Sequence, residues 1–183
     1  MQKLKIILKR WLPLALAATL IIGLSYVLVQ QDLRISANDP QIQMAEDAAS
    51  SLGAGQSIES IVPATKIDIA TSLAPYLVVY DDAGKPLASS GLLHNQMPSL
   101  PSGVFDYVRA KGENRITWQP EQGVRSAVVI ARVTGARQGF VMAGRSLREV
   151  EAREDNELKL SMLGGILTLG ALLVWIAVLE FLL

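Results

Sequence analysis

The stretch Gly144–Leu183, GRSLREVEAREDNELKLSMLGGILTLGALLVWIAVLEFLL, decides how the rest of the chain is interpreted. Ser146 is followed three residues later by Glu149, a capping-box pattern that predicts the start of a helix. No proline and no loop cluster follows, so a single helix is predicted to continue to Leu183. At about 1.5 Å per residue this helix is about 57 Å long, whereas the hydrocarbon core of a bilayer is about 30 Å thick. We therefore expect a helical stalk at residues 146–159 and a membrane span at residues 160–183.

A second apolar segment lies near the N-terminus. Leu12 to Val29 is an uncharged run of 18 residues, and Leu160 to Leu179 is a charge-free run of 20 residues. Each run is long enough for one membrane crossing. We therefore predict a first span at residues 12–30 and a folded domain between the two spans at residues 31–145.

The charges indicate an orientation in the membrane. Four basic residues and no acidic residue precede the first apolar run: Lys3, Lys5, Lys9 and Arg10. Residues 31–158 carry 12 Lys and Arg against 16 Asp and Glu, a balance of −4. By the positive-inside rule, residues 1–11 stay in the cytoplasm, the central domain is exported, and the second span returns the C-terminus to the cytoplasm.

A cleaved signal peptide is the alternative interpretation of the N-terminal segment. Its basic start fits a signal peptide, but an apolar run of 18 residues exceeds the usual hydrophobic region of about 7 to 15, and QQDLRISA after it lacks a small-x-small cleavage site. We therefore expect an uncleaved anchor. The chain contains no cysteine, which excludes disulfides, iron–sulfur clusters and cysteine-based zinc sites.

An antiparallel sheet is predicted in the middle of the chain. YLVVY at residues 76–80 is rich in β-branched and aromatic residues, and the turn residues DDAGK separate it from a returning strand, PLASS. Three more strands are predicted at residues 115–119, 125–133 and 139–144. The predicted fold class is α+β: a five-stranded antiparallel sheet with flanking helices on one side of it, between two transmembrane helices.

Two helices are predicted beside this sheet. The first has Asp39 as its cap and Pro40 in its first helical position. Its apolar face consists of Ile42, Ala45, Ala49 and Leu52. The second runs from Ser102 to Gly112. Its apolar positions are Val104, Tyr107 and Val108. Residues 91–103 before it, which include two prolines, are predicted to be irregular.

This arrangement resembles the Cache-type, PAS-like sensor domains of bacterial histidine kinases and chemoreceptors. The resemblance rests on a membrane span followed by an exported helix, on the YLVVYDDAGKPLASS hairpin, and on FVMAGRSLREVEARE leading into the second span. It covers residues 12–183, which correspond to the input half of such a receptor. It implies a protein of the bacterial inner membrane, embedded in the lipid bilayer, that takes part in signal transduction.

The output of such a receptor is missing from these residues. We find no histidine-containing phosphoacceptor helix and no glycine-rich nucleotide-binding segment, so we expect the output to come from a separate histidine kinase or receptor protein. A homodimer is also expected, because four stalk residues follow a three-four spacing typical of a short coiled coil. These residues are Leu147, Val150, Glu154 and Leu158.

The sequence gives little support for a catalytic site or a metal site. His94 is the only histidine, and one histidine without cysteine does not make a metal site, so we expect a solvated loop residue, with acid sensing as the alternative. Asp81 and Asp82 precede a glycine and are interpreted as turn residues. No serine lies in a nucleophile elbow. We therefore expect no enzyme, cofactor or metal, and a negatively charged exported domain is not expected to bind nucleic acid.

A small-molecule pocket is the remaining possibility. In the resembling family, ligands sit between the sheet and the connections that cover it, which implicates Tyr80, Trp118, Arg125 and Arg132 here. An arginine there would bind a carboxylate through two hydrogen bonds. The alternative is that both aromatic residues belong to the core and that both arginines are solvated strand ends.

The predicted function is therefore a membrane-anchored extracytoplasmic sensory module. It would bind a small ligand or an envelope partner and relay this event through the second span to a separate cytoplasmic effector. The alternative is a structural or assembly factor of the cell envelope that binds another membrane protein and senses nothing. A filled space between sheet and helix would support the alternative, and a cavity with Arg125 or Arg132 pointing inward would support sensing.

Overall fold

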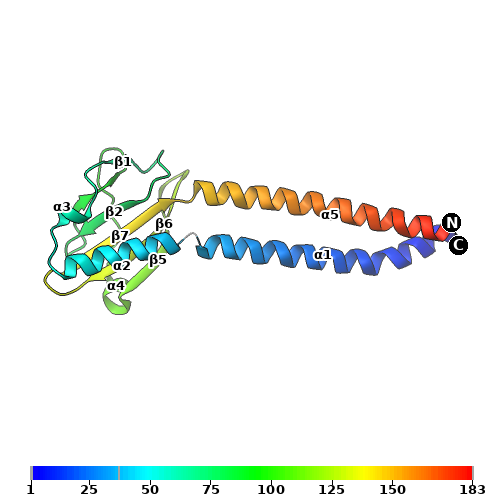
Figure 1. Cartoon of the computed structure of the whole chain (residues 1–183), viewed down its shortest axis with the longest axis horizontal. Helices are drawn as coiled ribbons and strands as arrows, with labels where there is room; N and C mark the ends of the chain where they lie inside the picture. The colour runs from blue at the N-terminus through cyan, green and yellow to red at the C-terminus, as the bar shows by residue number, and fades with distance from the viewer. Residues whose placement is uncertain (1, 37, 183) are drawn as a thin grey trace. The chain divides into compact units, whose positions relative to one another are not determined.

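The computed structural model describes residues 2–36 and 38–182, which form two compact units (Figure 1). One unit comprises residues 1–34 and 151–183, and the other comprises residues 35–150. The first contains nearly all of helix α1 (Gln2–Ser36) and most of helix α5 (Arg148–Leu182). The second is the α+β domain.

The domain is built on a five-stranded antiparallel sheet, as predicted. In space the strands follow the order β3-β2-β7-β6-β5. They are β2 (Tyr76–Tyr80), β3 (Pro86–Ser89), β5 (Glu113–Glu121), β6 (Val124–Val133) and β7 (Gly139–Ser146). Because β7 pairs with both β2 and β6, the last strand of the sheet lies at its centre and leads directly into α5.

Helices cover both faces of the sheet, so the prediction that they lie on one side is wrong. Helix α2 (Asp39–Gly53) packs against β6 and β7, and Figure 1 shows it lying across these strands. Helix α4 (Ser102–Lys111) packs on the opposite face. Side chains of a strand alternate between faces, and both sets are apolar in β2 and β7. Both faces therefore have to be covered.

Aromatic side chains fill the space under α4. The ring of Phe105 lies 5.1 Å from that of Tyr80 and 4.9 Å from that of Phe140, measured between centroids. The buried residues of α4 are Phe105 and Val108, whereas Tyr107 is 50% exposed, which corrects the predicted apolar face. Such aromatic packing stabilises the fold largely through the apolar area that it buries.

Short elements that were not predicted cover the same face. Strand β1 (Ile67–Asp68) pairs in parallel with β4 (Gly91–Leu92), within the segment that was predicted to be irregular. Residues 93–96 then form a tight turn, in which His94 and Asn95 adopt positive φ angles of 50° and 61°. The short helix α3 (Ile58–Ile61), where the sequence predicts a helical stretch at residues 57–61, instead packs on the α2 face, and the Ser57 side chain at its start accepts a hydrogen bond from the Ser60 amide.

The helix starts differ from the predictions by one or two residues. Helix α2 has Asn38 as its N-cap, so Pro40 is its second residue. Strand β7 continues to Ser146, and α5 begins at Arg148. The Ser146 hydroxyl accepts a 3.3 Å hydrogen bond from the Arg148 amide, so Ser146 still binds the first turn of the helix from the end of a strand.

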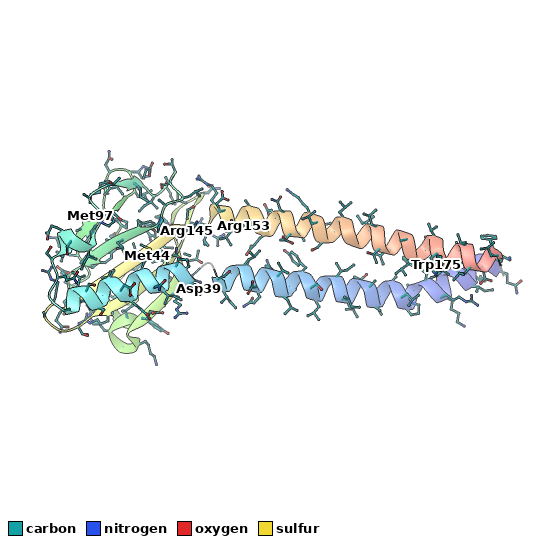
Figure 2. The ribbon with its side chains drawn as sticks, in the orientation of Figure 1. Asp39, Met44, Met97, Arg145, Arg153 and Trp175 are labelled. Carbon is teal, nitrogen blue, oxygen red and sulfur yellow. The ribbon has the colours of Figure 1, made fainter. Side chains whose placement is uncertain are left out.

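The long helices are each apolar enough to cross a membrane. Helix α1 begins well before residue 12, so Pro13 lies inside the helix and not at its start, and Figure 1 shows a bend in the blue part of α1. Apolar side chains surround both helices, and Trp175, labelled in Figure 2, is 63% exposed. The bounds of the spans within these helices stay predictions.

Candidate functional site

Two of the four predicted ligand-binding residues lie in one row across the sheet. Tyr80 on β2 is the register partner of Phe140 on β7, which in turn is the partner of Arg132 on β6. Tyr80 is buried, and its hydroxyl donates a 2.9 Å hydrogen bond to the carbonyl of Pro98. Burial raises the pKa of Tyr80 far above its usual value, so its hydroxyl stays protonated. Tyr80 is thus a residue of the filled core.

The other two predicted residues lie elsewhere. Trp118 is half-buried and pairs with Ser126, toward the other end of the sheet. Arg125 is exposed and, by the alternation of side chains along β6, lies on the opposite face from Arg132. The four residues therefore do not surround one cavity.

Arg132 is part of a cluster of charges around the ring of Phe140. Its guanidinium lies 4.6 Å from the ring centroid and 2.6 Å from a carboxylate oxygen of Asp82. Arg109 on α4 also lies over this ring, at 5.2 Å, and donates a hydrogen bond to the carbonyl of Asp82. The cluster joins the β2–β3 turn to α4 and β6. Because these arginines are already paired, its arrangement favours a structural role.

The turn before β3 explains why Asp81 and Asp82 differ. One carboxylate oxygen of Asp81 accepts hydrogen bonds from the amides of Ala83 and Lys85, at 2.9 and 2.8 Å. Gly84 has a φ angle of 81°, which a glycine adopts readily. Asp81 is therefore the turn residue that the sequence predicts, while Asp82 binds Arg132.

A polar pocket of about 480 Å³ lies beside α2 and has Arg132 among its lining residues. It lies between α2 and the β5–β6 edge of the sheet. Its charged or hydroxyl-bearing lining residues are Glu46, Ser50, Lys111, Glu113, Arg132 and Thr134. The Arg132 guanidinium is bound to Asp82 and to the side chain of Gln138, so it is not directed at a ligand there.

A second pocket of about 330 Å³ lies among the short elements that cover the sheet. It is formed by β1, β4 and the turn at 94–95, and its lining residues are Lys66, Ile67, Asp68, Leu92, His94 and Asn95. We call it the β1–β4 pocket. The Lys66 ammonium donates one hydrogen bond, of 2.6 Å, to the carbonyl of Ser89. An ammonium has three donors, so Lys66 retains capacity for an acceptor group of a ligand.

His94 extends from this pocket toward the β5–β6 hairpin. Its Nε2 atom lies 2.8 Å from a carboxylate oxygen of Glu121. This hydrogen bond and the negative charge of Glu121 raise the pKa of His94. The sequence did not reveal this pair, because the two residues are separated by 27 positions and belong to no shared motif.

The β1–β4 pocket is connected to the first turn of α5. The carboxylate of Asp68 accepts hydrogen bonds from the Ala70 amide, at 3.0 Å, and from the Thr71 hydroxyl, at 3.3 Å. The guanidinium of Arg148 donates a 2.8 Å hydrogen bond to the carbonyl of Thr71. A pocket residue and the start of the helix are thus two contacts apart.

Within residues 2–36 and 38–182, no group of three or more histidines and carboxylates is arranged to hold a metal ion. No protein-family model matches the sequence, and no curated protein matches it.

Proposed function

We propose that this chain is a two-span protein of the bacterial inner membrane that displays a PAS-like, Cache-type sensory domain outside the cytoplasm. The domain binds a small ligand or an envelope partner and relays that event through α5 to a separate cytoplasmic protein. The observation that carries the proposal is the hydrogen bond from Arg148 to the carbonyl of Thr71. It links the covering segment of the domain to the helix that enters the second span.

A stiff, continuous α5 would relay a movement in the domain to the second span. Helix α5 is continuous from Arg148 to Leu182, so a displacement of its first turn is carried along the helix. Asp68 holds Thr71 in place, and Asp68 also lines the β1–β4 pocket. A ligand that moves Asp68 would therefore change the position of the Thr71 carbonyl and, with it, that of Arg148.

The β1–β4 pocket is the best candidate for the ligand site. The face beneath α4 is filled by aromatic side chains, whereas the connections that cover this face enclose polar space. Lys66, His94 and Asn95 supply donors, and Asp68 supplies an acceptor. This combination suits small polar molecules such as amino acids and carboxylates.

The PAS-like assignment is supported by the sheet and by the order of the elements. A helix precedes a five-stranded antiparallel sheet, and the central strand leads into the helix of the second span. The basic residues before the first apolar run support an orientation with both termini in the cytoplasm.

A ligand screen tests the proposal. The full chain in lipid nanodiscs is heated with a library of amino acids and carboxylates, and at least one compound is expected to raise Tm. The variants Lys66→Gln and Asp68→Asn should abolish this shift. Arg137→Gln, at an exposed residue outside the pocket, should retain it. If no compound shifts Tm, the ligand-binding form of the proposal is lost.

A structural or assembly role is the second candidate, and the filled interface beneath α4 favours it. In that case the exported domain would bind another envelope protein through its surface. Photocross-linking from surface positions in cells would then capture one partner, while the ligand screen shows no shift.

A further inference from the structure

Two ion pairs join α1 to α5 at opposite ends of their apolar regions. Arg34 forms two hydrogen bonds with the carboxylate of Glu154, at 2.8 and 3.3 Å. Arg10 lies 3.0 Å from the carboxylate of Glu180. Both glutamate side chains are largely covered, with exposed fractions of 15% and 16%. Helices α1 and α5 therefore supply each other's charged partners.

The spacing of the two pairs matches the thickness of a bilayer. Arg10 and Arg34 are 24 residues apart on α1, which corresponds to about 36 Å of helix. Glu154 and Glu180 are 26 residues apart on α5, which corresponds to about 39 Å. The hydrocarbon core is about 30 Å thick, and the membrane with its headgroups is about 40–45 Å. Each pair is thus placed at the level of the headgroups, one on either side.

Between the pairs the helices are not closely interlocked. An apolar groove of about 310 Å³ separates them, and its lining includes the small residues Thr19, Gly23, Ser161 and Gly165. A Cβ atom added to Gly23 would meet no atom within 4 Å, and one added to Gly165 would meet only the tip of Ile22, at 3.9 Å. The small residues therefore do not determine the relative position of the helices by close packing.

Further polar contacts join the two helices near Arg10. Lys3 donates a hydrogen bond to the carbonyl of Glu180 and lies over the ring of Phe181. The indole of Trp11 donates a 3.1 Å hydrogen bond to the carbonyl of Leu169.

We propose that the two ion pairs, Arg10–Glu180 and Arg34–Glu154, are a register clamp that holds α5 against sliding along α1. Sliding by one helical turn, about 5.4 Å, would separate both pairs at once. That this movement is the signal rests on the proposed function, whereas the clamp itself does not.

Distance measurement between spin labels tests the clamp without any ligand. The chain has no cysteine, so Ile21→Cys and Leu167→Cys introduce two labels at exposed positions on the two helices. In lipid nanodiscs the native pairs should give one narrow distance distribution. Arg34→Glu should broaden or shift it, and the double variant Arg34→Glu with Glu154→Arg should restore it.

Two further variants keep the test decisive. Glu154→Gln removes the charge with little change of shape and should also broaden the distribution. Arg153→Glu reverses a neighbouring charge of α5, which Figure 2 labels, and should leave it unchanged. The clamp is refuted if Arg34→Glu and Glu154→Gln both leave the distribution narrow, or if the charge exchange does not restore it. Because no ligand is added, this outcome is independent of whether the proposed sensory function holds.

Discussion

The ring of Tyr76 on β2 lies between two glycines, Gly144 on β7 and Gly91 on β4. A Cβ atom at Gly144 would overlap the Cζ and hydroxyl atoms of Tyr76, and one at Gly91 would lie 2.8 Å from its Cγ. Tyr76 is 1% exposed, and burial raises its pKa to about 12. Gly144 is also the first residue of the GRSL sequence that leads into α5, so this glycine is required for packing.

We predict that Gly144→Ala destabilises the domain by about 1–3 kcal/mol, because the added methyl group overpacks a filled site. Gly103→Ala is the matched control, since a Cβ atom at Gly103 in α4 would meet no atom within 4 Å. It should be neutral or slightly stabilising, because alanine favours a helix over glycine. Urea unfolding of the full chain, followed by tyrosine and tryptophan fluorescence, measures both. Equal stabilities for the two variants would contradict the packing described for Tyr76.

The ion pair between His94 and Glu121 should make stability depend on pH. The pKa of His94 is raised in the folded state by Glu121 and, to a smaller extent, by Asp68. A raised pKa means that the contribution is complete below the unfolded value of about 6.5 and is lost as pH rises through the folded value. The Tm difference between the native chain and His94→Gln should therefore be larger at pH 5.5 than at pH 8.5.

The Tm difference between the native chain and His94→Gln should be small, because His94 is exposed and water and salt screen its ion pair with Glu121. Raising the salt concentration to 1 M should reduce it further. Glu121→Gln should remove the same pH dependence. A difference that grows with pH, in either variant, would show that the pair is not formed in solution.

The cluster around Phe140 should stabilise the fold. Arg132→Met retains the contact of an apolar stem with the ring but leaves Asp82 without this partner. We expect a loss of about 1–2 kcal/mol in the free energy of unfolding, from the partly exposed ion pair with Asp82 and the cation–π contact with Phe140. Arg137→Met, at an exposed position of the following turn, is the control and should change it by less than about 0.5 kcal/mol. If Arg132 bound a ligand but did not stabilise the fold, Arg132→Met and Arg137→Met would have similar free energies of unfolding.

The contact between Arg148 and Thr71 should protect the covering segment from local opening. Arg148→Ala should increase amide hydrogen exchange at Ala70–Ser72 by about tenfold or more, because hydrogen bonds to charged groups contribute about 1.5–3 kcal/mol and each 1.4 kcal/mol corresponds to a factor of ten. Arg145→Ala, at the exposed residue labelled on β7 in Figure 2, is the control. Unchanged exchange at these amides in Arg148→Ala would remove the observation on which the proposed relay rests.

Much of the sheet could be predicted because its signals are local. The β2–β3 hairpin is specified by YLVVY and by the turn chemistry of Asp81 and Gly84, and the structure confirms it. The placement of helices on both faces was missed, although the nearly continuous apolar sequence of β6 indicates a strand covered on both sides. The two-residue strands β1 and β4 have no periodicity to detect.

The candidate site was harder to predict from the sequence than the sheet. The β1–β4 pocket joins residues 66–68 to residues 92–95, and neither segment carries a recognisable motif. The ion pair between His94 and Glu121 forms only because the fold brings the turn at residues 93–96 next to the β5–β6 hairpin. Tyr80 and Arg132 were selected by residue type and strand position, which indicate where a side chain lies but not whether the space beside it is already filled.

The topology of the chain is the most direct test of the central claim, that the α+β domain lies outside the cytoplasm between two spans. Single cysteines are introduced at Ala136, in the exposed turn before β7, and at Gln2, at the start of α1. Intact spheroplasts are then treated with a membrane-impermeant maleimide. The account predicts that Ala136→Cys is labelled in intact spheroplasts and that Gln2→Cys is labelled only after lysis. Labelling of Gln2→Cys in intact spheroplasts, with Ala136→Cys protected until lysis, would contradict it.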